Sequence, residues 1–450
     1  MKVFKKILIA NRGEIAVRII RACRNIGIKS IAVYSVEDKD SMHVKLADQS
    51  ICIGKGPAVN NYLNKDQIIT AALNAGADAI HPGFGFLSEN ADFARLCTEN
   101  DIVFIGPQPS VIEKMGNKSQ ARTTMLNAGV PIVPGTKEPL YDSKIAIALA
   151  EQIGYPVMIK ASSGGGGKGM RIAYDENEFE LKFNMAQTES VNAFGDNTMY
   201  IERYLANPKH IEIQIIADNF GNVVSLGERD CSVQRNHQKL IEESPSPAIT
   251  DEIRDSMNEY AVMAAKAVGY TNAGTIEFIM DNTGEYFFME MNTRIQVEHG
   301  VTEMVTNTDL VIEQIKVAMG HKLSFQQDDI KMTGHVIECR INAEIPEKNF
   351  IPSPGRITNI HLPAGNGVRV DTFIYNGYTL PSEYDSMIAK VLVHAPTRDL
   401  AIAKMMTALD EMLIIGINTN LDFQYKIMLN ETFREGNINT GFVAQLLNKA

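Results

Sequence analysis

The first hundred residues alternate between short apolar segments and longer amphipathic ones, and this alternation most constrains the fold. We expect strands at 6–10, 30–34, 77–80 and 102–105, and helices at 13–25, 66–75 and 90–99. Such an alternation predicts a parallel sheet wrapped by helices. The loop Asn11-Arg12-Gly13 lacks the spaced glycines of a dinucleotide fingerprint, so NAD binding is not expected.

A second unit follows, and the whole chain is long enough for two or three domains with separate cores, because it has 450 residues. In the second unit we expect a helix at 143–152 and strands at 156–160, 170–174 and 198–202. The remainder mixes strands and helices. These patterns predict an α/β protein.

Composition excludes several classes of partner. The net charge of −11 argues against a nucleic-acid surface, which needs a basic patch to displace counterions. Five scattered cysteines, never spaced Cys-x-x-Cys, indicate reduced thiols rather than a disulfide framework or a zinc site. The apolar run at 7–10 is too short for a signal peptide, and no stretch has the apolar length of a membrane span. We expect a soluble, cytoplasmic protein with no nucleic-acid or membrane partner.

A hairpin is predicted in the third quarter of the chain. Two alternating segments, 275–280 and 286–292, flank the turn-forming run Asp281-Asn282-Thr283-Gly284. If Asp281 pairs with Gly284, Glu277 falls opposite Phe288 on the neighbouring strand.

Strand alternation within this hairpin places Glu277, Glu290 and Asn292 on one face. Side chains this close can share one ion, and oxygen ligands without His or Cys suit Mg²⁺ or Mn²⁺. The alternative is a solvated strand face with incidental acids. The third oxygen ligand favours the metal site.

Four motifs occur in an order that resembles the biotin carboxylase family of the ATP-grasp superfamily. They are Ala10–Ala16 (ANRGEIA), His81–Asn90 (HPGFGFLSEN), Lys160–Ser163 with the four glycines after it, and Glu290–Glu298 (EMNTRIQVE). The resemblance runs from about residue 4 to about residue 445. It implies an ATP-grasp fold with an N-terminal parallel-sheet domain (1–114), a mobile lid domain (115–204) and a larger mixed α+β part (205–450) that includes a C-terminal domain at about 335–442.

The glycine run Gly164–Gly169 connects two predicted strands. It does not open a helix as a Rossmann turn would, and Gly169 stands where a P-loop has Ser or Thr. A disordered surface loop is the alternative reading. The resemblance implies instead that the loop belongs to a lid that closes over ATP.

The resemblance also implies a set of nucleotide-binding residues, which individually would be unremarkable. They are Lys118, Lys160, Gly165, Gly166, Gly167, Glu202, Tyr204, Leu205, His210, Gln234, His237, Glu277 and Glu290. Lysines here would offset phosphate charge. Strict alternation in 210–214 predicts that His210 points away from the core, as an exposed side chain.

Bicarbonate and biotin are expected to meet a second set of residues. Arg294 offers the guanidinium fork that a planar oxyanion prefers, and Gln296 with the backbone N–H of Val297 could complete its hydrogen bonds. Glu298 is then placed to act as general base on bicarbonate.

Two further residues of this second set are implied by the resemblance. Lys239 is expected to bind bicarbonate, and Arg340 to stabilise the enolate-like ureido oxygen of biotin. For Arg340 a buried ion pair with Glu338 is the alternative. Gly300 replaces the family's usual proline, which should loosen the turn, and Phe84 replaces a common tyrosine.

The implied reaction is the carboxylation of biotin with ATP and bicarbonate through carboxyphosphate, assisted by Mg²⁺ or Mn²⁺, with two ions expected. The nearest string to a biotin-attachment motif, Ala403-Lys404-Met405-Met406, lies in a predicted helix and lacks the first Met. We therefore expect biotin on a separate carrier protein, carboxyltransferase subunits as partners, a homodimer, and the stand-alone role found in bacterial acetyl-CoA carboxylase. The alternatives are another ATP-grasp ligase and a regulatory protein that binds nucleotide without catalysis.

Overall fold

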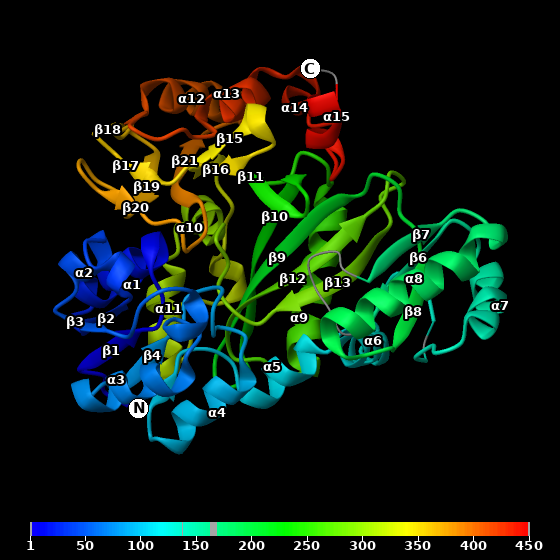
Figure 1. The fold of residues 1–450 in the computed structure, drawn as a ribbon, viewed down its shortest axis with the longest axis horizontal. Coiled ribbons are helices and arrows are strands. Elements are labelled where there is room, and N and C mark those ends of the chain that lie inside the picture. Colours follow the sequence, from blue (N-terminus) through cyan, green and yellow to red (C-terminus); the bar gives the residue numbers. More distant parts are fainter. Residues whose placement is uncertain (1, 137, 163–168, 449–450) are drawn as a thin grey trace.

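A computed structural model describes residues 2–136, 138–162 and 169–448. Its N-terminal part is the predicted parallel sheet, with strand order β3-β2-β1-β4-β5 (Figure 1). The strands are β1 Lys6–Ile9, β2 Lys29–Tyr34, β3 Gln49–Cys52, β4 Ala79–His81 and β5 Val103–Phe104. The helices are α1 Gly13–Asn25, α2 Met42–Leu46, α3 Lys65–Ala75 and α4 Ala91–Glu99, with short 3₁₀ turns η1 Val36–Asp38 and η2 Ala58–Asn60.

The loop after β1 connects this strand directly to α1. Gly13 adopts φ +68°, a left-handed conformation that glycine tolerates, and so lets the chain turn directly from β1 into α1. The apolar face of α1 is buried, as its pattern predicts. Asn11 is fixed by two hydrogen bonds from its amide to the carbonyls of Pro82 and Phe84. The two N-terminal motifs therefore lie side by side.

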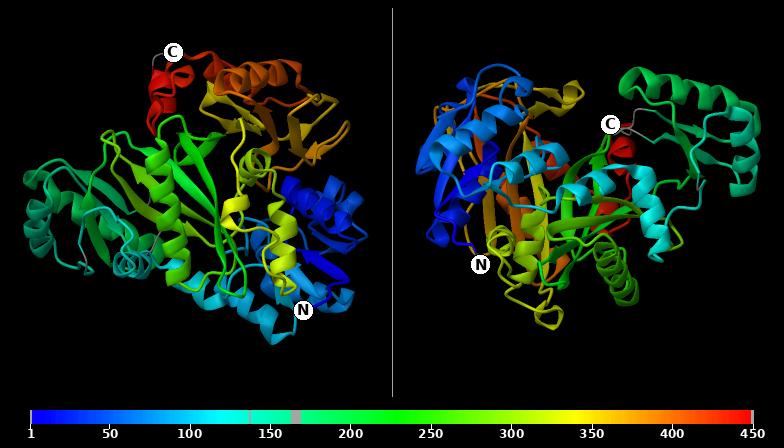
Figure 2. Two further views of the ribbon diagram at one scale, coloured as in Figure 1. Left: turned by 180° about the vertical axis from the view of Figure 1, so that it is seen from behind. Right: turned by 90° about the horizontal axis from the view of Figure 1, so that it is seen from below.

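A smaller three-stranded antiparallel sheet, order β7-β6-β8, lies at one side of the molecule (Figure 2). It consists of β6 Val157–Ala161, β7 Met170–Ala173 and β8 Met199–Arg203, covered by α7 Ser143–Ile153 and α8 Glu176–Phe194. Two helices, α5 Pro109–Gly116 and α6 Lys118–Asn127, connect it to the N-terminal part. Phe179 and Phe183 of α8 are fully buried in a core separate from the others. We call this unit the lid part.

The largest sheet has eight strands in the order β13-β12-β9-β10-β11-β14-β21-β19, and all its neighbours are antiparallel. The strands are β9 Lys209–Ala217, β10 Val223–Arg235, β11 Gln238–Ser244, β12 Asn272–Met280, β13 Tyr286–Asn292, β14 His335–Asn342, β19 Val368–Thr372 and β21 Met387–Ala395. The sheet continues without a break past residue 335, because β11 pairs with β14.

Helices and short strands surround this sheet. The helices are α9 Asp251–Ala267, α10 His299–Thr306, α11 Leu310–Ala318, α12 Arg398–Glu411, α13 Leu421–Leu429, α14 Glu431–Arg434 and α15 Phe442–Asn448, with 3₁₀ turns η3 Gln327–Asp329 and η4 Pro346–Lys348. The short strands are β15 Glu344–Ile345, β16 Ile351–Pro352, β17 Gly355–Arg356, β18 Asn359–His361, β20 Thr379–Leu380 and β22 Leu413–Ile415. Within the described residues, none of the helices combines the length and apolar character of a bilayer span.

The predicted β12–β13 hairpin is present, but its predicted register is wrong. The N–H of Asp281 donates to the carbonyl of Glu285, while the N–H of Gly284 donates to the carbonyl of Asp281 within the turn. Glu285 rather than Gly284 therefore lies opposite Asp281, and the turn is one residue longer. A bulge then places Glu277 opposite Glu290 instead of Phe288. The bulge restores the side-chain alternation, and the predicted shared face of Glu277, Glu290 and Asn292 is confirmed.

Candidate active site

A cavity of about 1520 Å³ opens between the lid part, the eight-stranded sheet and the loop after β1. The predicted residues that line it are Lys118, Lys160, Glu202, Tyr204, Leu205, His210, Gln234, His237, Lys239, Glu277, Glu290, Asn292, Arg294, Gln296, Val297, Glu298 and Arg340. Phe84 also lines it. Gly165, Gly166 and Gly167 lie outside the described residues. One cavity thus collects the predicted side chains from three separate parts of the chain.

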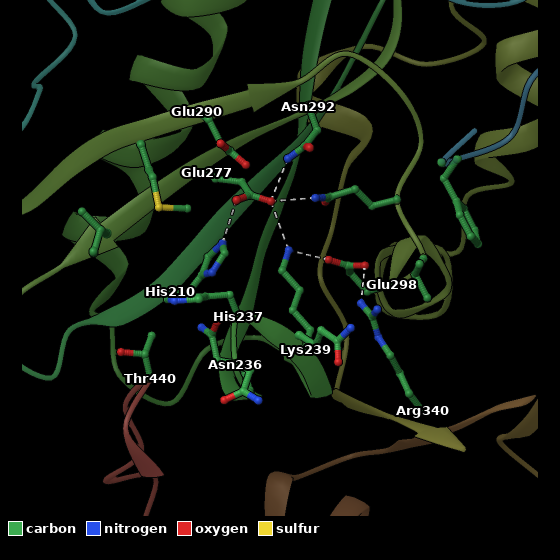
Figure 3. A pocket seen from close by; sticks show the side chains of 18 of the residues that line it. His210, Asn236, His237, Lys239, Glu277, Glu290, Asn292, Glu298, Arg340 and Thr440 are labelled. Carbon is green, nitrogen blue, oxygen red and sulfur yellow. Dashed lines mark hydrogen bonds and ion pairs between the residues drawn. The ribbon is translucent and has the colours of Figure 1, made fainter. Parts of the chain in front are cut away.

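Glu277 is a centre of hydrogen bonding in this cavity (Figure 3). Its Oε1 accepts from Asn292 Nδ2 at 2.7 Å, Gln296 Nε2 at 2.8 Å and Lys239 Nζ at 3.1 Å. His210 Nε2 lies 3.1 Å from its other oxygen. Burial would raise the pKa of Glu277, but the charges of Lys239 and His210 hold it well below its ordinary value. Glu277 is therefore ionised.

His210 corrects an expectation. It shares a face with Glu212 and Gln214, as predicted, but all three are buried rather than exposed. The cause is that this face is covered: the fully buried Arg229 donates to Glu212 and Gln214, and His210 lies against Glu277 in the cavity wall. Burial would lower the pKa of His210, and the neighbouring charge of Glu277 raises it above its ordinary value.

Lys239 lies among three carboxylates. Its Nζ is 2.6 Å from Glu212, 3.1 Å from Glu277 and 2.7 Å from Glu298. Burial would lower the pKa of the ammonium, but Cys231 and these carboxylates raise it well above its ordinary value. The lysine therefore stays charged and partly neutralises a strongly acidic wall.

Glu298 lies between two cations at the start of α10. Its Oε1 accepts from Lys239 and its Oε2 accepts from Arg340 Nη2 at 2.8 Å (Figure 3). Burial would raise the pKa of Glu298, but Lys239, Arg340 and Arg229 lower it well below its ordinary value. The residue is consequently a carboxylate that can accept a proton.

Arg340 does not form the ion pair with Glu338 that is the alternative to its catalytic role. Its guanidinium contacts Glu298 and Glu242 instead, with Nε 2.6 Å from Glu242 Oε1. Arg340 and Glu338 do share a strand face, but Glu242, on the adjacent strand β11, lies closer to the guanidinium.

Glu290 has the electrostatic character of a cation ligand. Burial and the adjacent charge of Glu277 raise its pKa, while Lys118 and His210 oppose this. It makes no hydrogen bond within the part of the chain that the structure describes. Two carboxylates on one face, Glu277 buried and Glu290 half-buried, fit a divalent cation, which would relieve their repulsion.

Asn292 fits this cation site after one rotation of its amide. Its nitrogen now faces Glu277, and its oxygen accepts from Arg294 Nη2 at 3.1 Å. The group His210, Glu212 and Glu277 also lies close enough to bind a metal, but Lys239 already contacts both of those carboxylates.

Two residues that fix site side chains by hydrogen bonds were missed by the sequence analysis. Glu89, in the 81–90 motif, accepts from Arg294 Nε at 2.7 Å, and its place in that motif was the available signal. Arg229 is fully buried and donates to Glu212, Gln296 and Thr302. Nothing in its local sequence indicated this role, because its partners lie on three other segments.

The nucleotide side of the cavity is held by charge pairs. Lys160 and Arg122 both contact the carboxylate of Glu202. Burial would raise the pKa of Glu202, and these two cations lower it. His237 is exposed at the turn between β10 and β11, where it has φ +64°.

The three-stranded sheet and the larger antiparallel sheet with its paired glutamates enclose one cavity, which is the arrangement expected for the ATP-grasp fold. Family models match residues 3–112 (biotin carboxylase, N-terminal domain), 117–326 (carbamoyl-phosphate synthase L chain, ATP binding domain) and 338–445 (biotin carboxylase C-terminal domain).

Relatives match over almost the full chain. Biotin carboxylase 1 of Bacillus subtilis is 57% identical over 440 residues, which are 98% of each chain. A biotin carboxylase structure from Campylobacter jejuni has a TM-score of 0.95 and 50% identity, over 98% of this chain and 99% of that one. One of the pyruvate carboxylase subunits of Methanothermobacter thermautotrophicus is 52% identical over 98% of this chain and 89% of that protein. The chain belongs to the biotin carboxylase family, and its activity is the ATP-dependent carboxylation of biotin.

Proposed function

We propose that this protein carboxylates biotin carried on a separate biotin carboxyl carrier protein, using ATP and bicarbonate by way of carboxyphosphate. The observation that supports this most strongly is Glu298, an ionised carboxylate held between Lys239 and Arg340 in a cavity that also contains the Glu277–Glu290 pair. A base and a cation-binding site are both needed to activate bicarbonate with ATP.

ATP would occupy the side of the cavity next to the lid part. Lys118 and Lys160 would offset phosphate charge, and Glu202, Tyr204 and Leu205 would contact the adenine ring of ATP. His210, Gln234 and His237 would complete the nucleotide site. Glu277, Glu290 and Asn292 would hold Mg²⁺ or Mn²⁺, with two ions in the full complex. When bound, such ions neutralise charge on the phosphates.

Bicarbonate would bind beside Glu298. Arg294, Gln296 and the N–H of Val297 would hold its oxygens, together with Lys239. Glu298 accepts the bicarbonate proton as the oxygen attacks the γ-phosphate of ATP. Its low pKa makes it a weak base while Lys239 and Arg340 both contact it, so its basicity rises as those cations turn to the substrate.

Arg340 would act in the second half of the reaction. Carboxyphosphate yields carbon dioxide and phosphate, and the phosphate removes the biotin nitrogen proton. The guanidinium would then stabilise the negative charge on the ureido oxygen. Its hydrogen bond to Glu298 supports a role for Arg340 next to the site of the first step.

We place the protein in the cytoplasm, as a homodimer that works with carboxyltransferase subunits in acetyl-CoA carboxylation for fatty-acid synthesis. We further propose the division into domains 1–114, 115–204 and 205–450, with the second acting as a mobile lid. A second acceptor, pyruvate, is favoured by the similarity to the pyruvate carboxylase of Methanothermobacter thermautotrophicus. Isolating the carboxyltransferase that accepts carboxybiotin from this protein, and supplying it with acetyl-CoA or pyruvate, distinguishes the two.

The activity itself is tested by ADP release. With ATP and Mg²⁺, release should require bicarbonate and increase on adding free biotin. A rate of ADP release that is the same with and without bicarbonate would contradict the proposal.

A further inference from the structure

Two buried carboxyl groups lie directly behind Arg340. Glu242 of β11 and Glu338 of β14 are opposite each other in the antiparallel ladder, and both are fully buried. Opposite residues point to the same face, with Cβ atoms about 5 Å apart. Three of their four carboxyl oxygens, Glu242 Oε2 and both of Glu338, have no hydrogen-bond partner among the residues that the structure describes. The remaining oxygen accepts from Arg340.

The cations near Glu242 and Glu338 are too few to compensate a negative charge on both carboxyl groups. Arg340 is shared with Glu298, and Lys239 contacts Glu298 as well. Lys390 of β21 is the other cation near Glu338, but its Nζ donates to the Val297 carbonyl. That ammonium also lies 3.6 Å from Glu14 and 3.9 Å from Asp371. Two desolvated carboxylates this close together do not both ionise.

The direction of the pKa shifts agrees with this geometry. Burial raises the pKa of Glu338 well above its ordinary value, and Glu242 and Glu298 add to the effect against Lys390 and Arg340. Burial also raises the pKa of Glu242, to about 7, against the charge of Arg340. The direct contact with Arg340 makes Glu242 the ionised member.

We propose that Glu242 and Glu338 form a carboxyl pair holding one proton, in which neutral Glu338 lets ionised Glu242 fix the guanidinium of Arg340 beside Glu298. The inference rests on the proposed function, because Arg340 is the group positioned. The single negative charge of Glu242 holds the guanidinium in place. A second negative charge on Glu338 would weaken the positive potential that Arg340 offers to the substrate. When Glu298 accepts a proton, Arg340 stays tethered to Glu242 and remains free to bind charge that develops on the substrate.

The proton on Glu338 is tested by infrared difference spectroscopy at neutral pH. Subtracting the spectrum of Glu338→Gln from that of the unmodified protein should reveal a carboxylic-acid C=O band. Glu347→Gln, at an exposed glutamate of the same part of the chain, should give none. Absence of the band from the first difference spectrum would overturn the proposal. If Glu338→Gln fails to fold, Glu242→Gln replaces it. Removing the neighbouring charge should move the titration of the same band to lower pH, and an unmoved band would overturn the proposal.

The positioning role is tested by paired rates. Glu242→Gln should slow carboxybiotin formation roughly tenfold, the size of one charge-assisted hydrogen bond, while slowing bicarbonate-dependent ADP release much less. Equal losses of both rates, or none, would overturn it. The assigned role of Arg340 is tested separately by Arg340→Ser: if that variant loses both rates equally, the proposed function of Arg340 fails, while the infrared band still decides whether Glu338 carries a proton.

Discussion

Replacing Lys239 by Gln should move the acid limb of the pH–rate profile to higher pH. Of the cations Lys239, Arg340 and Arg229, Lys239 lowers the pKa of Glu298 the most, and its Nζ lies 2.7 Å from that carboxylate. Without it, the effect of burial is opposed less strongly, mainly by Arg340 and Arg229, so the pKa of Glu298 rises. A base works when it is deprotonated, so activity should be lost at a higher pH as the solution is acidified.

The magnitude follows from the contacts. Lys239 donates three charge-assisted hydrogen bonds, to Glu212, Glu277 and Glu298. Removing one partner of a buried charge pair lowers the free energy of unfolding by roughly 3–5 kcal/mol. We expect the lower end of this range because Lys239 lines an open cavity. Loss of the ammonium that fixes the base Glu298 and would contact bicarbonate should lower kcat/KM about a hundredfold at neutral pH.

The pH dependence of stability has a defined sign. The pKa of Glu298 and that of Glu277 are depressed in the folded protein, so each contributes stability above its unfolded pKa. That stability disappears as the pH falls through the depressed folded values. In Lys239→Gln the folded pKa values move up, so the stability at neutral pH should be smaller.

Two assays check this. The first is kcat/KM for bicarbonate-dependent ADP release across the acid range, and the second is urea unfolding at neutral pH. Lys331→Gln, at an exposed lysine that does not line the cavity, serves as the matched control. An acid limb at the same pH in Lys239→Gln and the unmodified protein would refute the electrostatic argument, whatever the loss in rate.

Two further substitutions test separate parts of the site. Glu290→Gln should raise the Mg²⁺ concentration needed for half-maximal ADP release and lower turnover by orders of magnitude, because a charged oxygen ligand is lost; metal dependence equal to that of Glu259→Gln, at an exposed glutamate, would remove Glu290 from the metal site. Gly300→Ala should destabilise the protein by about 1 kcal/mol in urea unfolding, since the new Cβ would lie 2.7 Å from Leu392 Cδ2 and overpacking outweighs the gain in helix propensity. Unfolding at an equal or higher urea concentration would show that Leu392 moves aside freely.

Much of the fold followed from periodicity. Helix α1 was predicted with both of its bounds, because its apolar residues recur at helical spacing and Gly27 follows it. Strand β3 was not predicted, since Gln49–Cys52 is a short edge strand with no buried residue. Sequence patterns detect burial on one face, and this strand has none to detect.

The site was predicted less completely. The bulge that pairs Glu277 with Glu290 depends on the fit of two strands, which no local residue signals. The burial of His210 was missed because alternation tells which side chains share a face, but not what covers that face. Arg294 and Glu89 are far apart in the sequence, so their contact depends on how the N-terminal part packs against the larger sheet.

The division of work between Glu298 and Arg340 is the central claim, and paired rates of ADP and carboxybiotin formation test it most directly. Glu298→Gln should depress both rates, because bicarbonate must lose its proton even when biotin is absent. Arg340→Ser should largely spare bicarbonate-dependent ADP release yet lower carboxybiotin formation by about a hundredfold, the cost of losing one oxyanion-stabilising donor. Equal losses of both rates in Arg340→Ser would contradict this account.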